Sequence, residues 1–247
     1  MPIDIGGHVI DTSSLAITSS FARTVVQDGL VFHVDAANKN SYAGSGTSWV
    51  DISPNARTAT LTNGPTFNSA NGGSIVFDGS NDYAEVGSSN AFGLGGLSAA
   101  TMTIWLKATR YSNYQYVAGF RDDGDFDFFF LLLDSGGGSV LTEARLRTTA
   151  GVYDINFEYV SYFGAWTHIA FVFGNNRTQL YLNGDLKAQN TSVTGAFGAA
   201  TNNFRIGTNG VSPAYYAKGD VASVNVYNRT LHRGEILANY YATKDRF

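Results

Sequence analysis

Three groups of side chains in this sequence have residue types and spacing that could do chemistry, and the first is a set of aspartates. Asp123, Asp125 and Asp127 alternate along the chain, so in an extended strand their carboxylates lie on one face. Clustered carboxylates raise one another's pKa or hold a cation. The spacing begins like a calcium loop, with Asp134 at the twelfth position, but Phe128 stands where such a loop requires Gly. A solvated strand end is therefore favoured, and a bound cation is the alternative.

Oxygen ligands also gather in one short loop, where Asp78, Asn81 and Asp82 fall within a single turn. Calcium takes about six to eight oxygen ligands, which is more than this loop supplies. Aspartate and asparagine side chains commonly hold turns by accepting hydrogen bonds from nearby backbone N–H groups. A side-chain-stabilised turn is therefore favoured over a metal site.

Tyrosines form the third group, and they are the candidate ligand-binding residues. Tyr111, Tyr114 and Tyr116 lie near one predicted loop, and Tyr215 and Tyr216 lie in another. Aromatic faces suit sugar rings, because both present flat apolar patches rimmed by polar groups. Tyrosines are also common on sheet surfaces and at subunit interfaces, and this plainer interpretation is favoured over a sugar site.

The groups needed for common kinds of catalysis are missing from the sequence. The four histidines show no metal-ligand spacing, and His33 and His168 are each predicted to be structural residues with satisfied hydrogen bonds inside a strand. No nucleophile elbow, phosphate loop or dinucleotide fingerprint is present. Glycosidases need two carboxyl groups close together, yet the glutamates, at positions 85, 143, 158 and 235, are far apart in sequence. The chain is therefore predicted not to be an enzyme.

The composition indicates which elements must position these groups. The 247 residues include 28 Gly, 17 Phe and 14 Tyr but only 4 Pro, and 15% are charged. Aromatic residues favour half-buried strands and Gly favours tight turns, so one all-β domain is predicted. A net charge of −4 without a basic patch argues against a nucleic-acid partner. No apolar stretch is long enough to span a membrane, no secretory signal is recognisable, and without Cys the fold needs no disulfide.

Periodicity predicts many short strands and one helix. The segment Phe126–Leu133 is apolar at nearly every position, which predicts a strand buried on both faces. Asn183-Gly184, between alternating apolar residues, predicts a hairpin with a type I′ turn. His232 and Glu235 have the spacing of a capping box, and the apolar stripe after them predicts a short helix lying on the sandwich. Other strands are predicted at 30–35, 49–52, 58–62, 74–77, 83–86, 101–109, 114–120, 145–149, 152–159, 166–173, 203–207 and 221–227.

Residues 1–28 differ from the rest, because they mix small polar residues with isolated apolar ones and keep no period. We interpret them as an extended N-terminal arm that anchors the domain or contacts another subunit. An unattached tail is the alternative. Residues 29–247 then form the sandwich domain, which is expected to fold without the arm.

A series of short motifs runs through residues 29–247. They are Leu30–Ala36, Ser41–Tyr42, Trp49–Ser53, Leu61–Thr66, Ser74–Gly79 with Asp82–Tyr83, Thr103–Leu106, Trp166–Ala170, Leu180–Gly184 and Val226–Leu231. In this order they resemble a laminin-G-like jelly roll of the concanavalin-A-like superfamily, and most of all those found in bacteriophage structural proteins. The resemblance implies an all-β fold of two antiparallel sheets packed as a jelly-roll sandwich.

The resemblance also implies a function. It implies a non-catalytic phage structural protein on the virion surface, as a capsid decoration or a tail or fibre component. Its partners would be other virion proteins and further copies of itself, with a trimer favoured. The alternative is a carbohydrate-binding lectin or adhesin that recognises cell-surface polysaccharide. A glycosidase ranks last, because the Glu-x-Asp-x-x-Glu strand of similar jelly-roll glucanases is absent.

The resemblance bears on calcium as well. Relatives make a structural calcium plausible at Asp78, Asn81 and Asp82. In this chain, however, Ala222 occupies a position in the last strand where relatives often carry an acidic residue. No cofactor is therefore expected.

Overall fold

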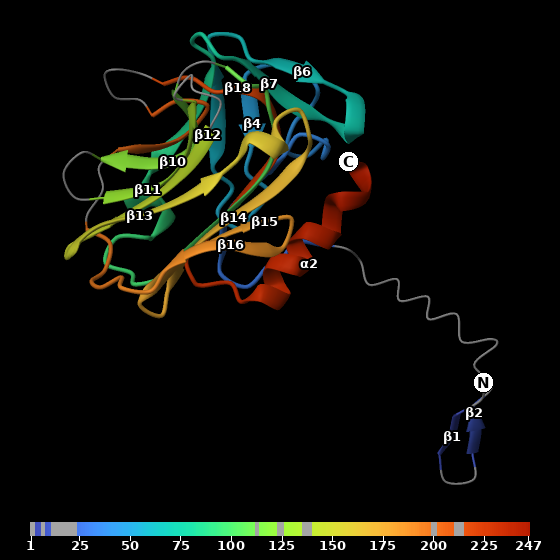
Figure 1. Ribbon diagram of the computed structural model, residues 1–247. Coiled ribbons are helices and arrows are strands. Elements are labelled where there is room, and N and C mark those ends of the chain that lie inside the picture. Colours follow the sequence, from blue (N-terminus) through green and yellow to red (C-terminus); the bar gives the residue numbers. More distant parts are fainter. Residues whose placement is uncertain are drawn as a thin grey trace.

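Two β-sheets packed face to face make up the body of the protein (Figure 1). The computed structural model describes residues 3–5, 8–10, 24–111, 114–122, 126–134, 140–198, 202–209 and 215–247. All strand pairs in both sheets are antiparallel among these residues. The predicted fold, an antiparallel jelly-roll sandwich with a short C-terminal helix, is confirmed.

The two sheets are built from strands that lie far apart in the sequence. The first sheet contains, in spatial order, β13 (Gly151–Glu158), β12 (Val140–Thr148), β11 (Phe126–Asp134), β10 (Tyr114–Asp122), β17 (Asn203–Ile206), β8 (Tyr83–Ser88), β5 (Thr58–Thr62) and β4 (Ser48–Val50). The second contains β16 (Asp185–Asn190), β15 (Arg177–Leu182), β14 (Thr167–Gly174), β9 (Ala100–Ala108), β18 (Lys218–Tyr227), β7 (Ser74–Asp78) and β6 (Thr66–Asn68), with β3 (Leu30–Asp35) also paired to β18. The short helices are α1 (Ser89–Phe92), η1 (Ala70–Gly72), η2 (Val160–Tyr162) and η3 (Lys244–Arg246).

Alternation along β11 explains why this strand is apolar almost throughout. Phe126, Phe128 and Phe130 point into the core between the sheets and are fully buried. Phe129 and Leu131 point to the outer face of the first sheet, where a second, smaller cluster buries them. The prediction of a strand buried on both faces is therefore confirmed.

Local signals in the sequence set a tight turn and a helix start. Asn183 and Gly184 have φ of 52° and 83°, and they form the predicted turn between β15 and β16. Helix α2 (Arg233–Thr243) begins with the predicted capping box. The His232 side chain accepts from the Glu235 N–H, and the Glu235 carboxylate accepts from the His232 N–H.

Helix α2 lies against the outer face of the second sheet, as the apolar stripe predicted (Figure 1). The ring of Tyr240 is 5.7 Å from the ring of Trp105 on β9, and the ring of Phe247 is 4.4 Å from it. Ile236 joins a buried cluster that contains Leu30, Ala170, Val172, Tyr181, Tyr227 and Leu231. Of the helices described, none is long and apolar enough to cross a membrane.

The N-terminal segment contains a small hairpin of its own. β1 (Ile3–Ile5) pairs with β2 (His8–Ile10), while residues 11–23 lie outside the described part of the chain. Val25 and Val26 pack against the cluster under α2, and the Val26 N–H donates to Asn239 Oδ1 at 2.8 Å. The last residues of the predicted arm therefore contact the sandwich.

Candidate functional site

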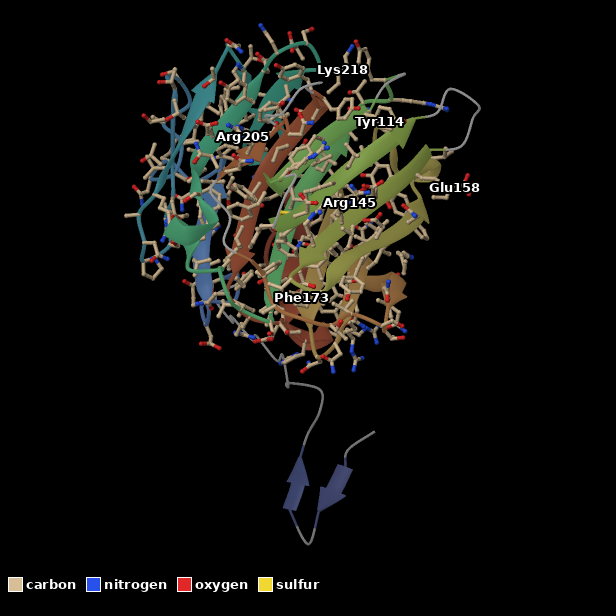
Figure 2. The ribbon with its side chains drawn as sticks, turned by 90° about the vertical axis from the view of Figure 1, so that its left-hand side faces the viewer. Tyr114, Arg145, Glu158, Phe173, Arg205 and Lys218 are labelled. Atoms are coloured by element: carbon tan, nitrogen blue, oxygen red, sulfur yellow. The ribbon has the colours of Figure 1, made fainter. Side chains whose placement is uncertain are left out.

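Polar and aromatic side chains gather on the outer face of the first sheet, on the side turned away from the core. Figure 2 looks toward this sheet, with Tyr114, Arg145 and Arg205 labelled across it. Strand register places one row of residues across the sheet: Thr60, Glu85, Arg205, Gly119, Phe129, Arg145 and Asp154. The outer-face cluster is this row together with its neighbours on the same face, Tyr116, Arg121, Asp127, Leu131, Glu143 and Arg147.

Phe129 lies at the centre of the outer-face cluster, opposite a glycine. Gly119 has a φ of 144°, and a Cβ added there would lie 2.5 Å from the Cβ of Phe129. The Phe129 ring is 5.1 Å from the Tyr116 ring and 1% exposed. The guanidinium groups of Arg121 and Arg145 lie 6.0 and 5.8 Å from the centroid of the Phe129 ring, at cation–π distance. Two arginines are thus positioned over one buried ring.

Arg145 holds carboxylates from two strands. Its Nε and Nη2 donate to Asp154 of β13 at 2.8 and 3.0 Å, and its Nη2 lies 3.1 Å from Glu143 on β12. Bidentate pairs of this kind are directional as well as charge-assisted. The three side chains therefore form a fixed polar group on the last two strands of the sheet, β12 and β13.

Two further arginines of the cluster each donate through Nε to one carboxylate. Arg205 Nε donates to Glu85 at 2.6 Å, between β17 and β8. Arg147 Nε donates to Asp127 at 2.9 Å, between β12 and β11. Each of these ion pairs connects two strands that are neighbours in the sheet.

Burial and neighbouring groups shift the pKa values of three side chains on this face. It raises the pKa of Glu143, although the charge of Arg145 opposes the shift. The hydrogen bond to Asp154 raises the pKa of Arg145. Burial, followed by the charge of Asp127, raises the pKa of Tyr116 well above its ordinary value, so this phenol is protonated at neutral pH. Its hydroxyl has no hydrogen-bond partner within the described ranges.

Folding brings together three of the five tyrosines predicted to be ligand-binding. The rings of Tyr114 and Tyr215 are 4.9 Å apart, and Tyr215 also packs against the buried group of Tyr116, Phe129 and Leu131. Tyr114 is 47% exposed. An aromatic pair of one exposed and one half-buried ring therefore borders the outer-face cluster.

The other two tyrosines make different contacts. The Nζ of Lys218 lies 5.4 Å from the centroid of the Tyr111 ring. Tyr216 pairs through its backbone with Thr208. Neither contact joins these residues to the Tyr114–Tyr215 pair.

Asp127 is the one member of the alternating aspartates whose side chain falls in the described part. Asp123, Asp125 and the side chain of Asp134 lie outside it. Asp127 is buried on the outer face and accepts from Arg147. The prediction of a solvated strand end is wrong for Asp127, because neighbouring strands and an arginine cover its carboxylate.

The loop with Asp78, Asn81 and Asp82 is held by its own aspartates. Asp78 Oδ1 accepts from the N–H groups of Ser80 and Asn81 at 2.7 and 3.4 Å, and Asp82 Oδ2 accepts from the Asp78 N–H at 3.1 Å. The bond from the Ser80 N–H lowers the pKa of Asp78, whereas burial raises that of Asp82. The carboxylates thus stabilise the turn. In the described parts of the chain, no three His, Cys, Asp or Glu side chains are grouped as metal ligands.

The two strand histidines have different surroundings. His168 is buried under α2 with its ring 5.3 Å from Trp105, and burial lowers its pKa to about 3. Its Nδ1 has no hydrogen-bond partner among the residues described, so the prediction of a satisfied histidine is wrong there. His33 lines a pocket of about 280 Å³ together with Asp35 and Ser223. Burial lowers its pKa, and the charges of Asp35 and Asp51 oppose this.

Apart from Asp127, sequence reasoning missed the charged side chains of the outer-face cluster. A signal for them was present, because Glu143, Arg145 and Arg147 alternate and therefore share one face of β12. Their partners come from β11 and β13, and only the strand order shows that these strands flank β12.

A laminin G family model, described as the concanavalin A-like lectin/glucanases superfamily, matches residues 78–237. This range includes the whole outer-face cluster except Thr60. No curated protein matches the chain.

Among solved structures, the chain is similar to receptor-binding domains of botulinum neurotoxins. With that of the C/D mosaic serotype it shares 13% identity at a TM-score of 0.67, over 87% of this chain and 52% of the other. With the serotype D binding domain it shares 14% identity at a TM-score of 0.68, over 87% of this chain and 51% of the other. With the serotype D ligand binding domain in complex with N-acetylneuraminic acid it shares 13% identity at a TM-score of 0.66, over 89% of this chain and 52% of the other. The chain thus spans about half the length of these domains, and the likeness is one of fold.

Proposed function

Because the chain belongs to the concanavalin A-like lectin/glucanases superfamily, we propose that it is a non-catalytic, lectin-like domain that binds glycans with the outer face of its first sheet. The observation that carries this proposal is the Tyr114–Tyr215 pair, in which Tyr114 is 47% exposed, on the same sheet face as the fixed polar group of Glu143 and Arg145. These side chains supply the two kinds of contact that a sugar ring requires.

The chemistry of a sugar matches the order of side chains on this face. A pyranose has an apolar C–H face that packs on aromatic rings, and a rim of hydroxyl groups that donate and accept hydrogen bonds. Tyr114 and the 42% exposed Leu141 lie toward one end of the sheet. Glu143, paired across strands with Asn156, follows in the next row, and Arg145 in the row after that. A glycan stacked on the tyrosines and extending across β11 would bring hydroxyl groups to these polar side chains.

The solved structures support glycans as the class to test first. One of them is a neurotoxin ligand binding domain in complex with N-acetylneuraminic acid. That ligand belongs to the neurotoxin domain, and it is used here only to choose probes.

An array of immobilised glycans tests the proposal directly. We expect the purified chain to bind at least one glycan class, and the free sugar to compete for the same binding. An array without binding that a free sugar competes would overturn the proposal. Size-exclusion chromatography of the same sample would exclude signal from aggregated protein.

We also propose that the domain is displayed on a virion surface as a capsid decoration or a tail or fibre component. The support is the resemblance of its ordered motifs to those of phage structural proteins. Partners would then be other virion proteins and further copies of this chain, most simply in a trimer. Mixing the purified chain with purified phage particles, followed by sedimentation and imaging, tests this. The chain should sediment with particles, and its absence from the pellet would count against display.

Hydrolysis of glycans is the second candidate function, and one observation favours it. Glu143 has a raised pKa, as a general acid requires, and Asp154 lies on the same arginine. Arg145 pairs with both carboxylates, however, which suits fixed binding groups better than a nucleophile. We expect no release of reducing sugar from β-glucans or bacterial polysaccharides. Turnover that disappears in Glu143→Gln would establish the enzyme instead.

A further inference from the structure

The charges of the outer-face cluster are balanced. Its positive side chains are Arg121, Arg145, Arg147 and Arg205, and its negative ones are Glu85, Asp127, Glu143 and Asp154. The two sets are equal in number. Glu158, at the β13 edge of the same face, adds one more carboxylate. The described part of this face therefore has no surplus of positive charge.

The arginines of this face are already engaged. Arg145, Arg147 and Arg205 lie 2.6 to 3.1 Å from their carboxylate partners. Arg121, beside the Phe129 ring, also has an interaction of its own. A ligand carboxylate that approached Arg145, Arg147 or Arg205 would therefore lie next to a carboxylate that the protein supplies, and would compete with it for the same guanidinium.

That competition is unfavourable because the protein's carboxylates are partly buried. The side chains of Glu143 and Asp127 are 17% and 2% exposed, so each depends on its arginine to offset the loss of water. Separating such a pair leaves a charge both desolvated and unpaired, and a ligand carboxylate nearby adds repulsion.

A neutral sugar requires no exchange of partners. Carboxylates offer two oxygens with about four lone-pair sites, so an arginine-paired carboxylate still accepts hydrogen bonds from hydroxyl groups. The arginines hold these oxygens in place, which lowers the entropy lost when a ligand binds. The Tyr114–Tyr215 pair contributes apolar contact that is independent of charge.

We propose that the ligand of the outer-face cluster is a neutral glycan rather than one bearing carboxylate or sulfate groups. This inference rests on the proposed function, glycan binding by the same face. The test compares matched probes. Conjugates of lactose and of cello-oligosaccharides are measured beside sialylated lactose and oligogalacturonate. We expect a neutral probe to bind at least about tenfold more tightly than its acidic counterpart, which corresponds to about 1.4 kcal/mol.

The salt dependence of binding also distinguishes recognition of a charged ligand from recognition of a neutral one. Raising NaCl from about 0.1 M to about 1 M shortens the Debye length from about 10 Å to about 3 Å, which weakens attraction between exposed charges. We expect the Kd for the neutral probe to change less than about twofold over this range. Tighter binding of an acidic probe that is lost at high salt would overturn the neutral-ligand proposal and leave glycan binding intact. Failure of all probes to bind would overturn both proposals.

A gain-of-binding variant tests whether the carboxylate partners of Arg145 set the preference for a neutral ligand. Asp154→Asn removes one of the two carboxylate charges at Arg145 and leaves Glu143 as the other, so the affinity for sialylated lactose should rise relative to that for lactose. Asp185→Asn is the matched control, because it removes the same charge from β16 of the second sheet. Equal effects of the two variants would show that Arg145 does not set the preference, and would contradict the proposal.

Discussion

The ring of Tyr114 lies 4.9 Å from the ring of Tyr215, and this contact joins the two halves of the chain at one surface. Tyr114 belongs to β10, whereas Tyr215 precedes β18 and is tied through its N–H to Asn209 Oδ1 at 3.1 Å. The candidate glycan site therefore exists only once the sandwich has assembled. Its stability and its binding can be tested separately.

Gly119 is predicted to be irreplaceable, because a side chain there would overlap Phe129 and the backbone of β11. We expect Gly119→Ala to lower the free energy of unfolding by about 3 kcal/mol or more. Gly46→Ala is the control, since Gly46 also has positive φ (90°) but no atom within 4 Å of an added Cβ. It should lose only about 1–2 kcal/mol from backbone strain. Urea unfolding measures both, and equal losses would refute the packing argument.

Acid should destabilise the protein partly through His168. Its pKa is about 3 in the folded chain and 6.5 ordinarily, so the unfolded chain binds more protons between these values. Stability then falls as pH drops from 6.5 toward 3, by up to about 1.4 kcal/mol per pH unit. In His168→Gln the decline should be shallower by that amount. Denaturant melts at several pH values test this, and parallel curves for the two proteins would contradict it.

Two truncations should separate the arm from the sandwich. Deleting residues 1–23 keeps Val25, Val26 and the hydrogen bond to Asn239, so the melting temperature should hardly change. Deleting residues 1–28 exposes part of the cluster under α2 and should lower it by about 5 °C or more. The sequence alone led us to expect little loss of melting temperature on deleting residues 1–28. Calorimetry that finds the same melting temperature for both would show that these contacts add nothing.

Calcium is predicted to be dispensable, because the carboxylates of Asp78 and Asp82 already accept from the backbone of their own turn. EDTA should therefore lower the melting temperature by less than about 5 °C. For a chain of this size, a fall of about 5 °C corresponds to a loss in the free energy of unfolding on the order of 1 kcal/mol or more. A larger fall that added calcium reverses would identify a site that the turn bonds do not explain.

Much of the fold could be predicted because its signals are local. The apolar run Phe126–Leu133, the Asn183-Gly184 turn and the His232 capping box each depend on a few neighbouring residues. The start of β12 was missed, because the glycine-rich stretch before Val140 is typical of a loop. Pairing with β11 along its whole length makes this segment a strand.

The candidate site was harder to predict because it depends on strand order. Tyr114, Tyr116 and Tyr215 were recognised from their residue type alone, without knowledge that they meet. The partner of Arg145 is Asp154 on the next strand, and the partner of Arg205 is Glu85, far away in sequence. Single-sequence reasoning finds pairs within a strand, and for that reason it also missed that Glu143 has carboxylates nearby.

The most direct test of glycan binding by this face is calorimetric titration of the neutral oligosaccharide that binds best on the array. Tyr114→Ala is compared with Tyr241→Ala, because both tyrosines are 47% exposed but Tyr241 lies on α2. We expect Tyr114→Ala to weaken binding at least about tenfold, equivalent to about 1.4 kcal/mol, and Tyr241→Ala to leave the Kd unchanged. Undiminished binding by a fully folded Tyr114→Ala protein would contradict the account.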